Sequence, residues 1–70
     1  MKNYKMELGK MFASNKLTKE EFIISVGILN QREKTTDSQK KRYYTRQLNR
    51  ILENKELVNF KHLEYYANLP

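Results

Sequence analysis

The chain has 70 residues, with 14 lysines and arginines against 8 aspartates and glutamates, which gives a formal net charge of +6. A domain this small buries only about 60% of the surface of its unfolded chain, so its stability is marginal without a further source of stabilisation. The absence of cysteine excludes disulfides and thiolate metal sites, and with His62 as the one histidine we expect no metal and no cofactor. We therefore expect a single domain, residues 1–70, that gains stability by forming a homodimer.

The sequence also argues against several classes of function. No apolar run reaches the roughly 18 residues of a membrane-spanning helix, and lysines interrupt the N-terminal segment where a signal peptide would have its apolar core. Gly9 and Gly27 are the only glycines, so there is no glycine-rich phosphate loop. With no thiol nucleophile and no acidic cluster suited to magnesium, we expect a cytoplasmic protein that is not an enzyme and does not bind membranes.

Local patterns predict the first two helices. Tyr4, Leu8, Met11 and Phe12 follow the spacing of one apolar helix stripe, which predicts a helix over residues 2–13. The next helix has a complete start signature, with Thr18 as N-cap, Glu21 as its capping-box partner, and Leu17 and Phe22 placed as a hydrophobic staple. We expect this second helix to span residues 18–31.

The second predicted helix is apolar on nearly every side. Phe22, Val26 and Leu29 share one face, whereas Ile24 and Ile28 lie on the opposite face. Such a helix must be covered from more than one direction, either by its neighbours in the same chain or by a second copy. A third interpretation, a buried strand over the same segment, conflicts with the capping box. The predicted dimer interface consists of Ile24, Gly27 and Ile28, with the glycine allowing close approach.

A polar connector, residues 31–38, leads to a third helix over residues 38–54, with Thr36, Asp37 and Ser38 as candidate N-caps. One side of this helix is apolar, and the opposite side is basic. The apolar side carries Tyr44, Leu48, Ile51 and Leu52, and the basic side carries Arg42, Arg46 and Arg50.

Positive charge is concentrated in the same region. The stretch from Arg32 to Arg50 holds seven basic and two acidic residues, which accounts for +5 of the net charge. A clustered basic face is typical of nucleic-acid binders, because lysine and arginine neutralise phosphates and release counterions. Arginine also pairs with guanine, and asparagine and glutamine with adenine, from a helix in the major groove. The predicted nucleic-acid-binding residues are Gln39, Lys40, Lys41, Arg42, Tyr43, Arg46, Gln47, Asn49 and Arg50.

A plainer interpretation is that these side chains only keep an exposed helix in solution, with Arg46 and Arg50 paired to Glu53 across one turn. We also find no recognisable helix-turn-helix motif, because the polar connector before the third helix is longer than the tight turn of that motif.

The last segment is compatible with two structures. An apolar stripe that follows Asn59 predicts a helix over residues 59–67, although residues 58–66 are also rich enough in aromatic and branched side chains for a strand. Tyr65 and Tyr66 have aromatic rings that can stack on bases, but aromatic residues near the end of a chain more often pack onto a helical core. The apolar positions of this stripe are Leu57, Phe60, Leu63 and Ala67.

Together these patterns predict an all-α fold, a small bundle of three to four short helices that forms a dimer. The expected function is a DNA-binding regulator of transcription that favours double-stranded DNA and reads it with the third helix. The alternative is a small inhibitor or adaptor that docks on an acidic protein partner. The short, lysine- and asparagine-rich chain is also compatible with a regulator from a mobile element.

Overall fold

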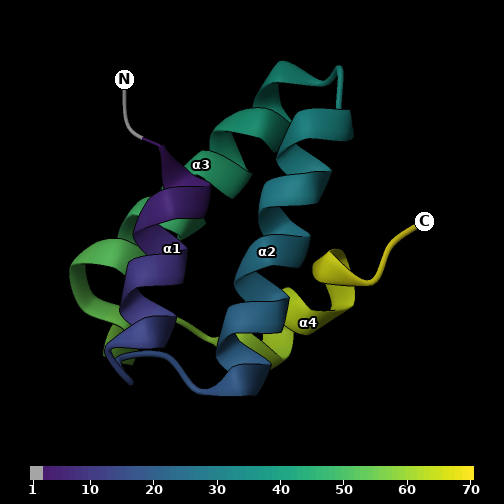
Figure 1. Cartoon of the computed structure of the whole chain (residues 1–70). Coiled ribbons are helices and arrows are strands. Elements are labelled where there is room, and N and C mark those ends of the chain that lie inside the picture. The colour runs from purple at the N-terminus through teal and green to yellow at the C-terminus, as the bar shows by residue number, and fades with distance from the viewer. Residues whose placement is uncertain (1–2) are drawn as a thin grey trace.

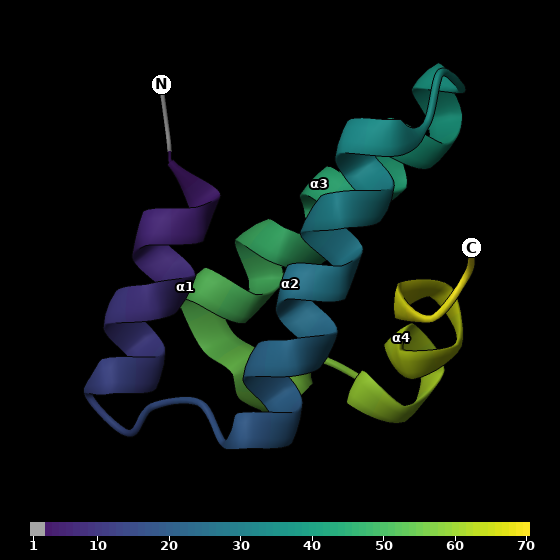
Figure 2. The ribbon, with the colours of Figure 1, turned by 45° about the vertical axis from the view of Figure 1, so that its right-hand side comes forward.

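The computed structural model describes residues 3–70, and every regular element within that range is a helix, as predicted. The elements are α1 (Tyr4–Ala13), α2 (Lys19–Lys34), α3 (Ser38–Asn54), the 3-10 helix η1 (Lys55–Leu57) and α4 (Phe60–Ala67). Helices α1, α2 and α4 lie side by side with α2 in the middle, and α3 passes behind them (Figures 1 and 2). No helix within residues 3–70 is long and apolar enough to cross a membrane.

Short polar side chains begin the helices, as their position in the sequence suggests. The side chain of Asn3 accepts a hydrogen bond from the backbone N–H of Met6, and Asn59 accepts one from His62. Of the three candidate caps before α3, Asp37 is the one used, and its carboxylate accepts from Gln39 N–H at 2.9 Å. Each cap satisfies a backbone donor that the first helical turn leaves unpaired. Residue 2, the predicted start of the first helix, lies outside the described residues.

The predicted capping box at the start of α2 is confirmed and extends further than the sequence indicates. Thr18 Oγ1 accepts from Glu21 N–H at 3.1 Å, and Glu21 Oε1 accepts from Thr18 N–H at 2.9 Å. The same Glu21 oxygen also accepts from Lys55 Nζ at 2.6 Å, just beyond the end of α3. One carboxylate therefore caps α2 and ties its first turn to η1, directly after α3.

The break after α1 is made by Asn15, whose φ of 61° places it in the left-handed region. The N–H of Lys16 donates to Met11 O at 2.8 Å, and the N–H of Asn15 donates to Phe12 O at 3.1 Å. This pair of bonds is a Schellman motif, which satisfies the last carbonyls of a helix. Asparagine tolerates the left-handed conformation better than most residues, so the local sequence stops α1 here.

Helix α2 is the centre of the molecule, and it packs against α1, α3 and α4. Neighbours within the chain therefore cover most of α2, as one interpretation expected, but Ile23 on its outer face stays 57% exposed. The prediction that Ile28 faces a second copy is wrong, because this side chain is fully buried within one chain. The buried apolar side chains are Leu8, Leu17, Ile28, Tyr44, Leu48, Ile51 and Leu63.

Gly27 is the point of closest approach between α2 and α4. A Cβ placed on Gly27 would lie 2.6 Å from the Cβ of Ala67 and 3.0 Å from the Ala67 carbonyl oxygen. The close approach that the sequence suggested is therefore real, but its partner is α4 of the same chain. Gly9 has no atom near its own virtual Cβ.

Helix α2 runs to Lys34, three residues past its predicted end, so the connector shrinks to residues 35–37. Gln31, expected in the connector, is instead buried in the helix, and its Nε2 donates to Leu69 O at 2.6 Å. Polar residues marked this segment as a loop, yet Arg, Glu and Lys are good helix formers and extend α2 at little cost. The Gln31 bond also holds the C-terminal residues against α2.

The two glycines form a matched pair for testing the α2–α4 contact. Gly27→Ala should destabilise the protein by about 1–3 kcal/mol, because the new methyl group forces α4 away from α2. Gly9→Ala should stabilise it by about 0.5–1 kcal/mol, because alanine favours a helix where there is room for a side chain. Urea unfolding followed by circular dichroism measures both. A stabilising Gly27→Ala would contradict the close approach.

Glu21 should make stability depend on pH. Its hydrogen bonds from Lys55 and then from the Thr18 backbone lower its pKa below the ordinary value of 4.5. Because the pKa of Glu21 is lower in the folded than in the unfolded chain, the ionised carboxylate stabilises the folded state when the pH is above 4.5. This stabilisation is lost as the pH falls through the lowered pKa. Glu21→Gln keeps the cap but loses the ion pair. It should therefore lower the free energy of unfolding by at most about 1 kcal/mol at neutral pH and leave it unchanged in acid. Equal losses in the free energy of unfolding at neutral and at acid pH would show that Glu21 does not make the stability depend on pH.

Candidate nucleic-acid interface

The rotation of α3 about its own axis determines which side chains reach solvent. Tyr44, Leu48 and Ile51 are buried against the rest of the bundle. Arg42, Arg46 and Arg50 leave the helix on the opposite side, and all three are exposed. These three residues, spaced four apart, form one row of about 12 Å along the helix axis, which we call the arginine ridge.

The arginine ridge has no carboxylate partner in the part of the chain that the structure describes. The ion pairs among residues 3–70 are Arg32–Glu33 at 3.2 Å and Lys55–Glu21 at 2.6 Å. Glu53 lines the same shallow depression on α3 as Arg46 and Arg50, but it forms no ion pair with either of them. The interpretation in which Glu53 neutralises the ridge is therefore wrong, and the three guanidinium groups face solvent.

One flank of the ridge is held by α1 and α2. Arg32, in the last turn of α2, donates from Nε to Thr45 Oγ1 at 2.7 Å, and its guanidinium lies 5.5 Å from the centre of the Tyr4 ring. The Tyr4 hydroxyl in turn donates to Asn49 Oδ1 at 2.9 Å. Three helices thus meet along this side of α3, and Arg32 is part of the packing rather than of a free basic surface.

This arrangement changes the predicted role of Asn49. Recognition of adenine by asparagine needs the amide oxygen as acceptor and the amide nitrogen as donor at once. The Asn49 oxygen accepts a bond from Tyr4, so in this structure Asn49 connects α3 to α1, and this bond sets the orientation of its amide. Sequence patterns could not find the pair, because 45 positions separate the two residues.

The other flank of the ridge is aromatic. The Tyr43 ring lies 5.8 Å from the Tyr44 ring and 5.6 Å from the Tyr66 ring of α4. Burial raises the pKa of Tyr43, and the neighbouring tyrosines Tyr66 and Tyr44 raise it further. Tyr66 docks on the core as one interpretation expected, with His62 and Tyr65 each at 5.2 Å from its ring. Tyr43 therefore packs α4 onto α3, which leaves it partly buried beside the ridge.

The remaining predicted residues divide between the ridge and other sides of α3. Gln39 is exposed and lies in line with the ridge, three residues before Arg42 and seven before Arg46. Lys40 and Lys41 precede the buried Tyr44 by four and three residues, so they leave the helix on the side away from the ridge, in a first turn that extends past the core. Gln47 is half-buried, one turn after Tyr43.

The link between α2 and α3 also differs from the prediction. It has three residues, 35–37, and a turn of three to four residues is the length found in helix-turn-helix motifs. The connector is therefore short enough for such a motif, and the prediction that it is too long is wrong. Residues 58–66, the alternative strand, form none: Val58 follows η1, and residues 59–66 belong to α4 and its cap.

Comparison of the chain with protein-family models, with curated proteins and with solved structures finds no match. Within residues 3–70, no three His, Asp or Glu side chains gather in a way that could hold a metal ion.

Proposed function

We propose that this chain is a DNA-binding regulator that contacts double-stranded DNA through the arginine ridge of α3. One observation carries the proposal: three exposed arginines lie in a single row and have no carboxylate partner among residues 3–70. A row of uncompensated guanidinium groups on a rigid helix is suited to an anionic partner whose charges also form a row. The phosphate backbone of a duplex is such a partner.

The geometry of α3 favours the major groove. The helix has 17 residues, and its width with side chains matches the roughly 12 Å width of that groove. Arg42, Arg46 and Arg50 project from one side over about two turns, so they can reach phosphates or guanine edges together. Gln39 in the same row adds an amide that can read adenine.

The packing of Asn49 and Tyr43 narrows the set of base-reading groups. Both were candidates from the sequence, but Asn49 accepts a bond from Tyr4 and Tyr43 packs against Tyr66. Their function in the proposal is to hold α3 at a fixed rotation. Binding then depends mainly on the arginines, and we expect a strong dependence on salt with modest sequence preference.

Replacing the arginine ridge should reduce both affinity and salt dependence. Three phosphate contacts correspond to a slope of about −2.7 in a plot of log K against log salt. The triple variant Arg42→Gln, Arg46→Gln, Arg50→Gln should lose a slope of about that size in fluorescence anisotropy titrations with duplex DNA.

The matched control removes the same charge from other surfaces, with Lys10→Gln, Lys16→Gln and Lys61→Gln, which are exposed and lie outside α3. This control should keep most of the wild-type slope. Equal losses in the two variants would mean that net charge alone attracts DNA. A wild-type protein with no salt-dependent DNA binding would favour the alternative, an acidic protein as partner of the ridge.

Comparing duplex DNA with duplex RNA tests the groove. The major groove of A-form RNA is too deep and narrow for an α-helix, whereas that of B-form DNA admits one. We therefore expect tighter binding to a DNA duplex than to an RNA duplex of the same sequence and length, measured at the same salt concentration. Equal affinities would show that α3 contacts only phosphates and does not enter the groove.

A further inference from the structure

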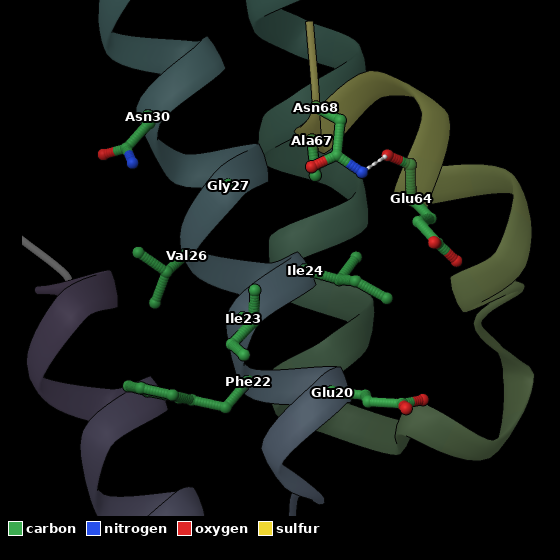
Figure 3. Close-up of a pocket in the computed structure, with 10 residues that line it drawn as sticks. All are labelled: Glu20, Phe22, Ile23, Ile24, Val26, Gly27, Asn30, Glu64, Ala67 and Asn68. Atoms are coloured by element: carbon green, nitrogen blue, oxygen red, sulfur yellow. Dashed lines mark hydrogen bonds between the residues drawn. The ribbon is translucent and has the colours of Figure 1, made fainter.

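The outer face of α2 carries apolar side chains that the bundle leaves uncovered. Ile23 is 57% exposed, and Val26 beside it is partly exposed. Both project away from the buried Ile28, at angles of about 140° and 160° around the helix. In Figure 3, Ile23 and Val26 extend outward from α2, whereas Ile24 points towards α4. The unpartnered face therefore differs from the one that the sequence suggested.

This face has a projection and a hollow one helical turn apart. Ile23 is the projection. The hollow lies beside the contact between α2 and α4, and its lining includes Val26, Gly27, Asn30 and Ala67 (Figure 3). Two copies of α2 that pack antiparallel about a two-fold axis near Val26 would each place Ile23 next to Asn30, at the end of the hollow of the other. A surface with this property is self-complementary, as a two-fold interface requires.

The charges at the two ends of the face follow the same symmetry. Lys19 lies seven residues before Val26 and Glu33 lies seven residues after it, and both are exposed on this side of α2. Antiparallel packing therefore places Lys19 opposite Glu33 of the partner subunit. A parallel arrangement would instead place like charges together.

We propose that a second copy of this chain docks on the outer face of α2, antiparallel, with the two-fold axis near Val26. The small size of the chain is consistent with a second copy as occupant, since a 70-residue domain with seven buried apolar side chains among residues 3–70 gains stability by covering more apolar surface. The complementary ends fix the direction of packing, and the apolar centre provides the driving force.

The proposed interface lies on the opposite side of the molecule from the arginine ridge. Helices α2 and α3 pack against each other through Ile28 and Leu48, so their outer faces point away from one another. A dimer formed in this way carries its two ridges on opposite outer sides. This consequence rests on the proposed function: such a dimer joins two duplexes and does not span two grooves of one duplex.

Sedimentation velocity without nucleic acid tests the docking surface independently of DNA binding. The wild type should show a concentration-dependent dimer, and Ile23→Glu should raise its dissociation constant at least about tenfold. Leu57→Glu is the control, because Leu57 is 75% exposed but lies outside α2, and it should leave the dimer unchanged. Unaltered circular dichroism spectra would show that both variants keep their fold. A wild type that stays monomeric up to millimolar concentration, or a dimer insensitive to Ile23→Glu, would overturn the proposal.

Charge reversal tests the antiparallel direction. Lys19→Glu and Glu33→Lys each place like charges opposite one another in the dimer and should weaken it about threefold or more. The double variant restores opposite charges and should recover the wild-type dissociation constant. Glu33 also pairs with Arg32, but this exposed pair contributes little to the fold. If the double variant dissociates as readily as the single ones, the antiparallel arrangement is wrong.

Discussion

Contact between α2 and α3 through Ile28, Leu48 and Ile51, all fully buried, fixes the rotation of α3 about its axis. A helix repeats every 3.6 residues, so burying one row of side chains commits the opposite row to solvent. The row opposite Leu48 and Ile51 holds Arg42, Arg46 and Arg50. Burial of a few aliphatic side chains thus places the arginines on a rigid, outward-facing ridge, and the proposed contact with DNA depends on that placement.

Several polar contacts hold this central packing at its edges. Glu21 joins the start of α2 to Lys55 beyond α3, and Gln31 holds the C-terminal segment at Leu69. Each such bond contributes about 1 kcal/mol at most in net terms, far less than the apolar core, but each one fixes an end of a helix. The same applies beside the ridge, where the bond between Tyr4 and Asn49 orients α3.

The two faces proposed to bind partners lie on opposite sides of the molecule and depend on different interactions. The arginine ridge depends on charge and is therefore sensitive to salt, whereas the outer face of α2 depends on the burial of Ile23 and Val26 and responds little to it. Because α2 and α3 are packed back to back, occupation of one face does not obstruct the other. A protein of 70 residues can in this way carry both a self-association surface and an anion-binding surface.

Local interactions, which act within one or two turns of the chain, determined the helices of this protein. The Thr18–Glu21 capping box, the Asn59 cap and the periodic apolar residues of α3 are of this kind, so the sequence alone predicted the all-α fold, the start of α2 and the outward side of α3. The tertiary structure alone decided which side of α2 is buried, that Gln31 is held by Leu69, and that Asn49 and Tyr43 are held by other helices. Those outcomes depend on partners some 20 to 45 residues away in the sequence, and no periodic pattern records which distant residue a side chain will meet.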